Sequence, residues 1–151
     1  MADIKVVATN RRARHDYEII DEFEAGLVLT GSEVKSLRAG KANLKDSFAY
    51  IRDGEVWLVG AYIAPYSFAR LGGHDPERSR KLLLHRREID RIAGSLAEKG
   101  LTLVPMRLYF KDGKAKVQIG LGRGKRTIDK RADLKKREHE REMERARRRF
   151  R

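Results

Sequence analysis

The chain has 151 residues, 35 lysines and arginines against 22 aspartates and glutamates, a formal net charge of +13, and no cysteine. These values exclude disulfides and thiolate metal sites, and the length predicts one domain with at most a small appendage. A positive excess of this size predicts a polyanionic partner, either nucleic acid or an acidic membrane surface. We expect a cytoplasmic protein, because we find no signal-peptide pattern and no apolar run near the roughly 20 residues that cross a bilayer.

Residues 17–122 predict mainly short strands. The run VLTGSEVKSLRAGK indicates a strand around Leu27–Leu29 and then a helical turn, with Ser32 as its N-cap and Gly40 ending it in a left-handed conformation. Two β-hairpins are expected around Asp53-Gly54 and Asp112-Gly113, because Asp-Gly pairs between β-rich runs suit tight turns.

The run HRREIDRIAGSLAEKG, between the two hairpins, predicts a helix. Its apolar residues follow the spacing of one helical face and are Ile89, Ile92, Ala93, Leu96 and Ala97. Gly100 is expected to end this helix. The preceding run YSFARLGGHDPERSR predicts an exposed loop, because its glycines and proline break regular structure.

Five or six short strands and one packing helix are too few for a sandwich of two full sheets. Closure into a small barrel would remove the unpaired edges that so few strands otherwise expose. We therefore expect a mainly β fold, a small OB-type closed barrel of about six antiparallel strands with added helices, over residues 1–122. A split α+β sheet is the alternative.

Residues 123–151 predict a separate basic tail, with 14 basic and 6 acidic side chains and a net charge of +8. Its apolar residues form no continuous stripe. Pairs such as Glu138 with Arg141 and Glu142 with Arg145 support a helix by only about 0.2–0.5 kcal/mol each. We expect the tail to be disordered or marginally helical when free and to fold against a negative surface. A merely solubilising tail is the alternative.

The stretch GLGRGKRTIDKR, residues 120–131, does not spell a nucleotide-binding loop. The phosphate-loop pattern G-x-x-x-x-G-K-[ST] fails, since Ile119 stands where its first glycine belongs and Arg126 where its last residue belongs. The dinucleotide pattern G-x-G-x-x-G fails because Lys125 replaces the last glycine.

Catalysis is also poorly supported by the sequence. His15 and Asp16 are adjacent, and on an extended segment they would point to opposite faces. The four histidines share no repeated spacing, so we expect no metal site, no cofactor and no enzymatic activity. A membrane-surface role would require an amphipathic basic helix, and the tail lacks a broad apolar face.

Three basic clusters favour nucleic acid as the partner. They occur in NRRARHDY, KSLRAGKANLK and ERSRKLLLHRRE, the last of which includes Arg78, Arg80 and Lys81. Arginine matches phosphate geometry with two parallel hydrogen bonds, and His15 or Tyr17 could stack on an unpaired base. For each cluster alone, a solvated surface is the alternative.

The motifs RARHDY, FEAGLVLTGSEVKSLRAGKANLKDS, RKLLLHRREI and GRGKRTIDKR, in this order, resemble the SmpB family of SsrA-binding proteins. The resemblance extends from about Asn10 to Arg131. It implies an OB-type barrel without catalysis that binds the tRNA-like domain of tmRNA and delivers it to stalled ribosomes for trans-translation. It also implies contact with small-subunit rRNA and with an elongation factor carrying alanyl-tmRNA, and we expect a monomer.

The resemblance implies two sets of site residues. The residues implied to bind tmRNA are His15, Tyr17, Glu24, Arg38, Lys41, Leu83, His85, Lys116, Arg123, Gly124, Lys125 and Arg126. Those implied to lie in the empty mRNA channel near the decoding centre are Ile128, Asp129, Lys130, Arg131, Lys135, Lys136, Arg137, Arg141 and Arg145. The glycines between these sets are expected to let the backbone approach RNA and to swing the tail.

Two positions depart from the family pattern. Gly122 stands where alanine is common, which implies a more flexible loop. Ile128 stands where histidine or an aromatic residue is frequent, which implies apolar contact in place of stacking. Two other hypotheses stay open from the residues alone: a generic nucleic-acid chaperone and an RNA-processing enzyme that uses His15 or His85.

Overall fold

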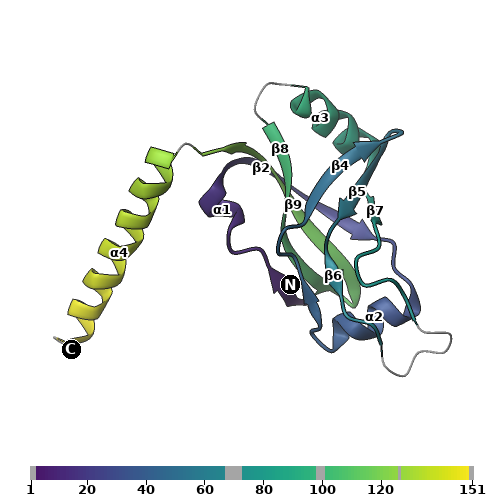
Figure 1. Ribbon diagram of the computed structural model, residues 1–151, viewed down its shortest axis with the longest axis horizontal. Helices are drawn as coiled ribbons and strands as arrows, with labels where there is room; N and C mark the ends of the chain where they lie inside the picture. The colour runs from purple at the N-terminus through teal and green to yellow at the C-terminus, as the bar shows by residue number, and fades with distance from the viewer. Residues whose placement is uncertain (1–2, 67–72, 98–100, 126, 150–151) are drawn as a thin grey trace.

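The computed structural model describes the backbone of residues 3–66, 73–97, 101–125 and 127–149, and the side chains of these residues except 127–133 and 147–149. A strongly curved β-structure forms its body, and one long helix extends away from it (Figure 1). The mainly β prediction, with antiparallel strands and added helices, is confirmed.

The strands outnumber the expected six. In chain order they are β1 (Ile4–Thr9), β2 (Tyr17–Leu27), β3 (Ala42–Asn43), β4 (Phe48–Arg52), β5 (Glu55–Val59), β6 (Tyr62–Ile63), β7 (Arg80–Leu83), β8 (Leu101–Lys111) and β9 (Lys114–Gly124). The largest difference concerns β2, predicted only around Leu27–Leu29. It is long because Glu18, Glu22 and Glu24 face solvent while Phe23 and Ala25 are buried, which is the alternation of a half-buried strand.

Seven strands form one antiparallel sheet in the order β1-β8-β9-β2-β7-β5-β4, and β3 pairs with β6. Both predicted hairpins are confirmed. Asp53 and Gly54 have φ of 52° and 75°, and Asp112 and Gly113 have φ of 49° and 79°. The edge strand β4 packs against β8, and β1 packs against β3, so the curled sheet encloses its inner face.

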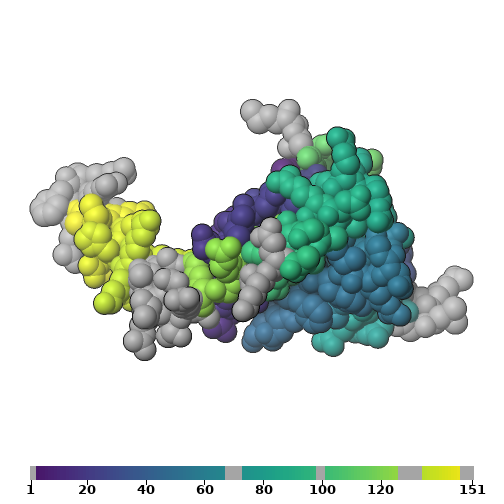
Figure 2. All heavy atoms as spheres, turned by 90° about the horizontal axis from the view of Figure 1, so that it is seen from above, coloured from purple at the N-terminus to yellow at the C-terminus, as the bar shows by residue number. Residues whose placement is uncertain are grey.

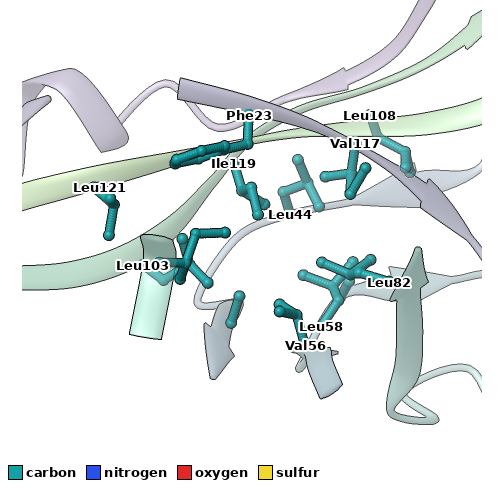
Figure 3. Packing of buried hydrophobic residues seen from close by; sticks show 14 of the residues in the cluster. Phe23, Leu44, Val56, Leu58, Leu82, Leu103, Leu108, Val117, Ile119 and Leu121 are labelled. Carbon is teal, nitrogen blue, oxygen red and sulfur yellow. The ribbon is translucent and has the colours of Figure 1, made fainter. Parts of the chain in front are cut away.

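That inner face holds the main hydrophobic core. Phe23 of β2, Leu108 of β8 and Val117 of β9 meet Leu58 of β5 and Leu82 of β7 (Figure 3). These side chains come from strands far apart in sequence, so the core depends on the long-range pairing of the sheet.

The described part of the chain has four helices, of which the last extends away from the sheet: α1 (Ala13–Asp16), α2 (Gly31–Arg38), α3 (Arg86–Leu96) and α4 (Thr127–Arg149). The predicted helix between the hairpins is confirmed as α3, whose Ile89 and Ile92 are buried. The buried face is narrower than predicted, because Leu96 is only half-buried and Ala93 and Ala97 are exposed. Its expected end at Gly100 lies outside the described residues.

The N-cap of α2 is Thr30, not the predicted Ser32. The Glu33 N–H donates to the Thr30 hydroxyl, and the Thr30 N–H donates to the Glu33 carboxylate, which is a capping box. Ser32 Oγ instead lies 2.8 Å from His74 Nδ1. The predicted end of the helix at Gly40 is confirmed by its φ of 75°.

A buried ion pair joins α2 to β7. Arg80 and Glu33 are both fully buried and paired, and Arg80 also donates to the carbonyls of Ala61 at 2.7 Å and Pro76 at 3.1 Å. Arg78 donates to the other oxygen of Glu33. The prediction that Arg80 belongs to an RNA-facing cluster is therefore wrong.

α4 extends the chain beyond β9 and stands apart from the strands that form the core (Figure 2). Strand β9 ends at Gly124, two residues beyond the predicted limit of the barrel at residue 122, and α4 begins at Thr127.

Candidate nucleic-acid interface

Strands β2 and β9 organise the predicted tmRNA-binding residues. Tyr17 opposes Gly124 at one end of this antiparallel pair, and Gly26 opposes Lys116 at the other. At about 3.3 Å per residue, these two ends lie roughly 30 Å apart along the strands. The predicted residues therefore divide into two groups, which we call the α1 end and the hairpin end.

The α1 end consists of His15, Tyr17, Arg123, Gly124 and Lys125. The Lys125 N–H donates to the Asp16 carbonyl at 2.9 Å, and Lys125 Nζ donates to the Arg14 carbonyl at 2.8 Å. These bonds fix the last residues of the sheet to α1. Arg126, predicted beside them, lies outside the described residues.

His15 and Asp16 contact each other, contrary to our expectation. Nδ1 of His15 lies 3.0 Å from Oδ1 of Asp16. The expectation assumed an extended segment, whereas both residues belong to the short helix α1. The contact leaves only one imidazole nitrogen for any other partner, because Nδ1 is already engaged.

The glycine-rich stretch is not a loop at its start. Gly122 lies within β9 and pairs with Ile19 of β2 and Thr102 of β8, so the expected local flexibility at Gly122 is wrong. A Cβ added at Gly122 would lie 2.9 Å from Cβ of Tyr17, and one added at Gly120 would lie 3.1 Å from Cγ2 of Ile19. These glycines make room for the side chains of β2.

The hairpin end brings together Glu24, Lys116 and Leu83. Gly26 of β2 pairs with Lys116 on one side and Leu83 on the other. Leu83 is 53% exposed, an unusual exposure for a large apolar side chain on a sheet. An exposed leucine on this surface is suited to contact with the apolar face of a sugar or base.

Glu24 is the acid of this basic surface, and both of its oxygens are engaged. Tyr109 Oη donates to Oε2 at 2.6 Å, and Lys111 Nζ donates to Oε1 at 3.2 Å. The Tyr109 hydrogen bond, opposed by partial burial and supported by Lys111, lowers the pKa of Glu24. Burial and the bond to Glu24 together raise the pKa of Tyr109. Glu24 therefore holds a tyrosine and a lysine in place.

Three further predicted residues adjoin the hairpin end. Arg38, at the end of α2, places its guanidinium 5.6 Å from the ring centre of Phe110. Lys41 follows α2 and is exposed, and its carbonyl accepts the Ala64 N–H at 3.0 Å. His85 is the exposed N-cap of α3, two residues after Leu83.

The predicted tail residues lie on α4. The exposed ones are Lys135, Lys136, Arg137, Arg141 and Arg145. The first turns of α4 contain Ile128, Asp129, Lys130 and Arg131. The structure describes the backbone of these four residues but not their side chains.

Sequence reasoning missed Arg107, Tyr109 and Lys111, which lie on the outer face of β8. Side chains alternate between the two faces of a strand, so the sequence of the second hairpin could have placed these residues on the same face as Lys116. The β-bulge between Pro105 and Arg107 changes this alternation only locally. The same alternation places Arg80 on the buried side with Leu82.

The described residues include no group of three or more histidines, aspartates and glutamates that could hold a metal ion. Within the same residues, no helix has the length and apolar character that a membrane span requires.

Comparison with known proteins identifies the family. Residues 7–149 match the family model of the SmpB protein. An SsrA-binding protein of Sulfurihydrogenibium sp. (strain YO3AOP1) is 59% identical over 142 residues, which cover 94% of this chain and 93% of that protein. One from Thermobifida fusca (strain YX) is 59% identical over 145 residues, covering 96% and 91%.

A solved structure is similar as well. It is described as "tmRNA-SmpB: a journey to the center of the bacterial ribosome", and one of its chains is 55% identical to this protein with a TM-score of 0.66, covering 79% of this chain and 84% of that one. The family match spans the curled sheet from within β1 onward, both groups of predicted residues and α4. The chain belongs to the SmpB family.

Proposed function

We propose that this protein binds tmRNA and delivers it to stalled bacterial ribosomes for trans-translation. The observation that carries the proposal is membership of the SmpB family over residues 7–149, which includes two relatives named SsrA-binding proteins at 59% identity. The excess of 13 positive charges supplies the electrostatic attraction that such an RNA partner requires. The proposed activity is cytoplasmic, because bacterial ribosomes work in the cytoplasm.

The hairpin end and the α1 end are the proposed tmRNA contacts. Exposed cations such as Arg38 and Arg123 would bind phosphates, and Leu83 would contact a sugar or base. Two groups about 30 Å apart suit one folded RNA better than one short single strand. Tyr17 is half-buried against Val104 and Met106, so it would offer a ring edge or hydroxyl, not a free face.

The protein is proposed to act without catalysis or cofactor, as a monomeric adaptor. Delivery of an RNA to the ribosome requires complementary surfaces and charge, and it requires no reacting group. In this proposal α4 enters the empty mRNA channel of the small subunit, where its exposed cations meet rRNA phosphates.

Recovery of RNA bound to the full chain in bacterial cells tests the proposal. We expect tmRNA to be enriched through a high-salt wash, and to be reduced by Arg38→Glu, since reversing an exposed charge at the hairpin end repels phosphate. Arg52→Glu, on the exposed β4–β5 turn, is the matched control. A mixture of RNAs without tmRNA enrichment would instead favour a generic nucleic-acid chaperone.

A further inference from the structure

A cavity of about 420 Å³ lies where α1, the outer face of β8 and β9, and α4 meet. Four arginines from three different parts of the chain line it: Arg11 just before α1 and Arg14 within it, Arg107 on β8, and Arg137 on α4. Arg11, Arg14 and Arg107 are absent from both sets of site residues that the family resemblance implies. The cavity lies beside the middle of β9, between the α1 end and the hairpin end.

Arg107 is held in place by neighbouring side chains. Its Nε donates to Oε1 of Gln118 at 3.0 Å, and its guanidinium lies 5.1 Å from the ring centre of Tyr109. Gln118 in turn donates to Glu22 at 2.8 Å, and Glu22 pairs with Arg14. Because the network fixes the arginine through Nε, its two NH2 groups stay available without further ordering of the side chain.

The cavity has an excess of positive charge. Arg14 is the member that pairs with a carboxylate, Glu22. Among the side chains that the structure describes, Arg11, Arg107 and Arg137 have no carboxylate within ion-pair distance. Cations gathered in one concave site repel one another, so an anion bound between them would be strongly favoured.

We propose that this cavity binds a phosphate group of the RNA backbone and thereby fixes α4 against the barrel. The inference rests on the proposed function, because the phosphate is taken to belong to the RNA that the protein carries. Guanidinium groups match phosphate geometry with paired hydrogen bonds, and a cavity of this size has room for a phosphodiester and part of a sugar. RNA bound to the barrel would thus also set the direction of the tail.

The first test uses inorganic phosphate and the full chain. We expect the Nε–H resonance of Arg107 to shift with saturation during a phosphate titration, and the shift to disappear in Arg14→Gln. The Nε–H of Arg52, exposed at the β4–β5 turn, is the internal control. An unchanged or non-saturating Arg107 resonance, the same as that of Arg52, would overturn the phosphate site.

The second test separates an RNA phosphate from a free anion. With the tRNA-like domain of tmRNA, we expect Arg107→Gln to weaken binding roughly tenfold and to reduce the slope of log K against log salt by about 1. Arg52→Gln should change neither value. If phosphate binds but Arg107→Gln and Arg52→Gln bind RNA equally, the cavity is a free-anion site and the RNA contact is wrong. Failure of the wild-type chain to bind this RNA would instead reject the proposed function.

The third test follows α4. Because the chain has no cysteine, Asp53→Cys and Met143→Cys allow one spin-label pair between the barrel and α4. We expect RNA to narrow the distance distribution between the labels, and Arg137→Gln to abolish the narrowing. A distribution that RNA narrows equally with and without Arg137 would show that the cavity does not fix the helix.

Discussion

Glu24 shows how an acid can serve a surface that binds a polyanion. Its two oxygens accept from Tyr109 and Lys111, so the carboxylate orders a hydroxyl and a cation at the hairpin end. Its negative charge is compensated locally by Lys111, with Lys116 also nearby. The negative charge of Glu24 therefore weakens the attraction of this surface for phosphate only a little. The carboxylate also anchors Lys111, which is half-exposed, and the buried Tyr109.

Replacing Glu24 with glutamine should lower the pKa of Tyr109 toward its ordinary value. The substitution removes the carboxylate that favours the protonated hydroxyl, whereas burial of the tyrosine is retained. A pH titration of the Tyr109 ring resonance measures this pKa. Glu18→Gln, exposed on the same strand, is the control and should leave the Tyr109 titration unchanged. Equal titration curves for wild type and Glu24→Gln would contradict the assigned hydrogen bond.

Gly122→Val should destabilise the fold, because even a Cβ at this position would lie 2.9 Å from Cβ of Tyr17. Overpacking of this kind costs about 1–3 kcal/mol. Gly124→Val is the matched control, since no described atom lies within 4 Å of a Cβ there. Denaturant unfolding of the two variants gives the comparison. Equal stabilities would mean that Tyr17 moves aside freely.

At the scale of elements, the pair Glu33–Arg80 attaches α2 to β7 and thereby positions Arg38. Burial of Glu33 alone would favour its neutral form. Hydrogen bonds from Arg78, the Thr30 N–H and Arg80 outweigh burial and lower the pKa of Glu33 to about 2. The folded state therefore binds fewer protons than the unfolded state between that value and the ordinary 4.5.

Acid should remove this stabilisation. A lowered pKa in the folded state contributes about 3 kcal/mol that is fully present above pH ~4.5 and is lost as the pH falls toward ~2. Glu33→Gln should flatten the pH dependence of unfolding in that range and cost roughly 3–5 kcal/mol at neutral pH, since Arg80 stays buried without its partner. Denaturant unfolding across pH measures both effects.

The exposed pair Arg86–Asp90 provides the control for that series. Its side chains are 67% and 63% exposed, so Asp90→Asn should cost no more than about 0.5 kcal/mol. The double variant Glu33→Leu with Arg80→Met should recover much of the loss of Glu33→Gln, because neither charge is then left buried alone. A double variant as unstable as the single one would show that packing, not unpaired charge, dominates.

Local patterns predicted the elements that local chemistry determines. Both Asp-Gly turns, the helix α3 with its buried Ile89 and Ile92, and the left-handed Gly40 depend on a few neighbouring residues and are confirmed. The burial of Arg80 and the position of Gly122 depend on strands that pair across the whole chain, so composition alone suggested a basic surface and a flexible loop. The contact between His15 and Asp16 was missed because a four-residue helix has almost no sequence signal.

At the scale of the whole molecule, the barrel and α4 are proposed to have separate tasks. Truncation after Arg126 keeps β9 and its bonds to α1, and it removes α4 entirely. We expect the truncated chain to retain most of its affinity for the tRNA-like domain, losing only the Arg137 contribution, and to fail to release stalled ribosomes. A reconstituted translation assay with a truncated message measures the second effect. Parallel loss of both activities would place α4 within the primary RNA site.

The most direct test of RNA recognition by the barrel surface is a salt series of binding constants for the full chain. It compares the tRNA-like domain of tmRNA with an RNA duplex of equal length. If about six phosphates are contacted, log K should fall against log salt with a slope near −4 to −5, and the preference for the folded RNA should persist at high salt. Equal affinity for both RNAs across the series, or a slope near zero, would contradict the account.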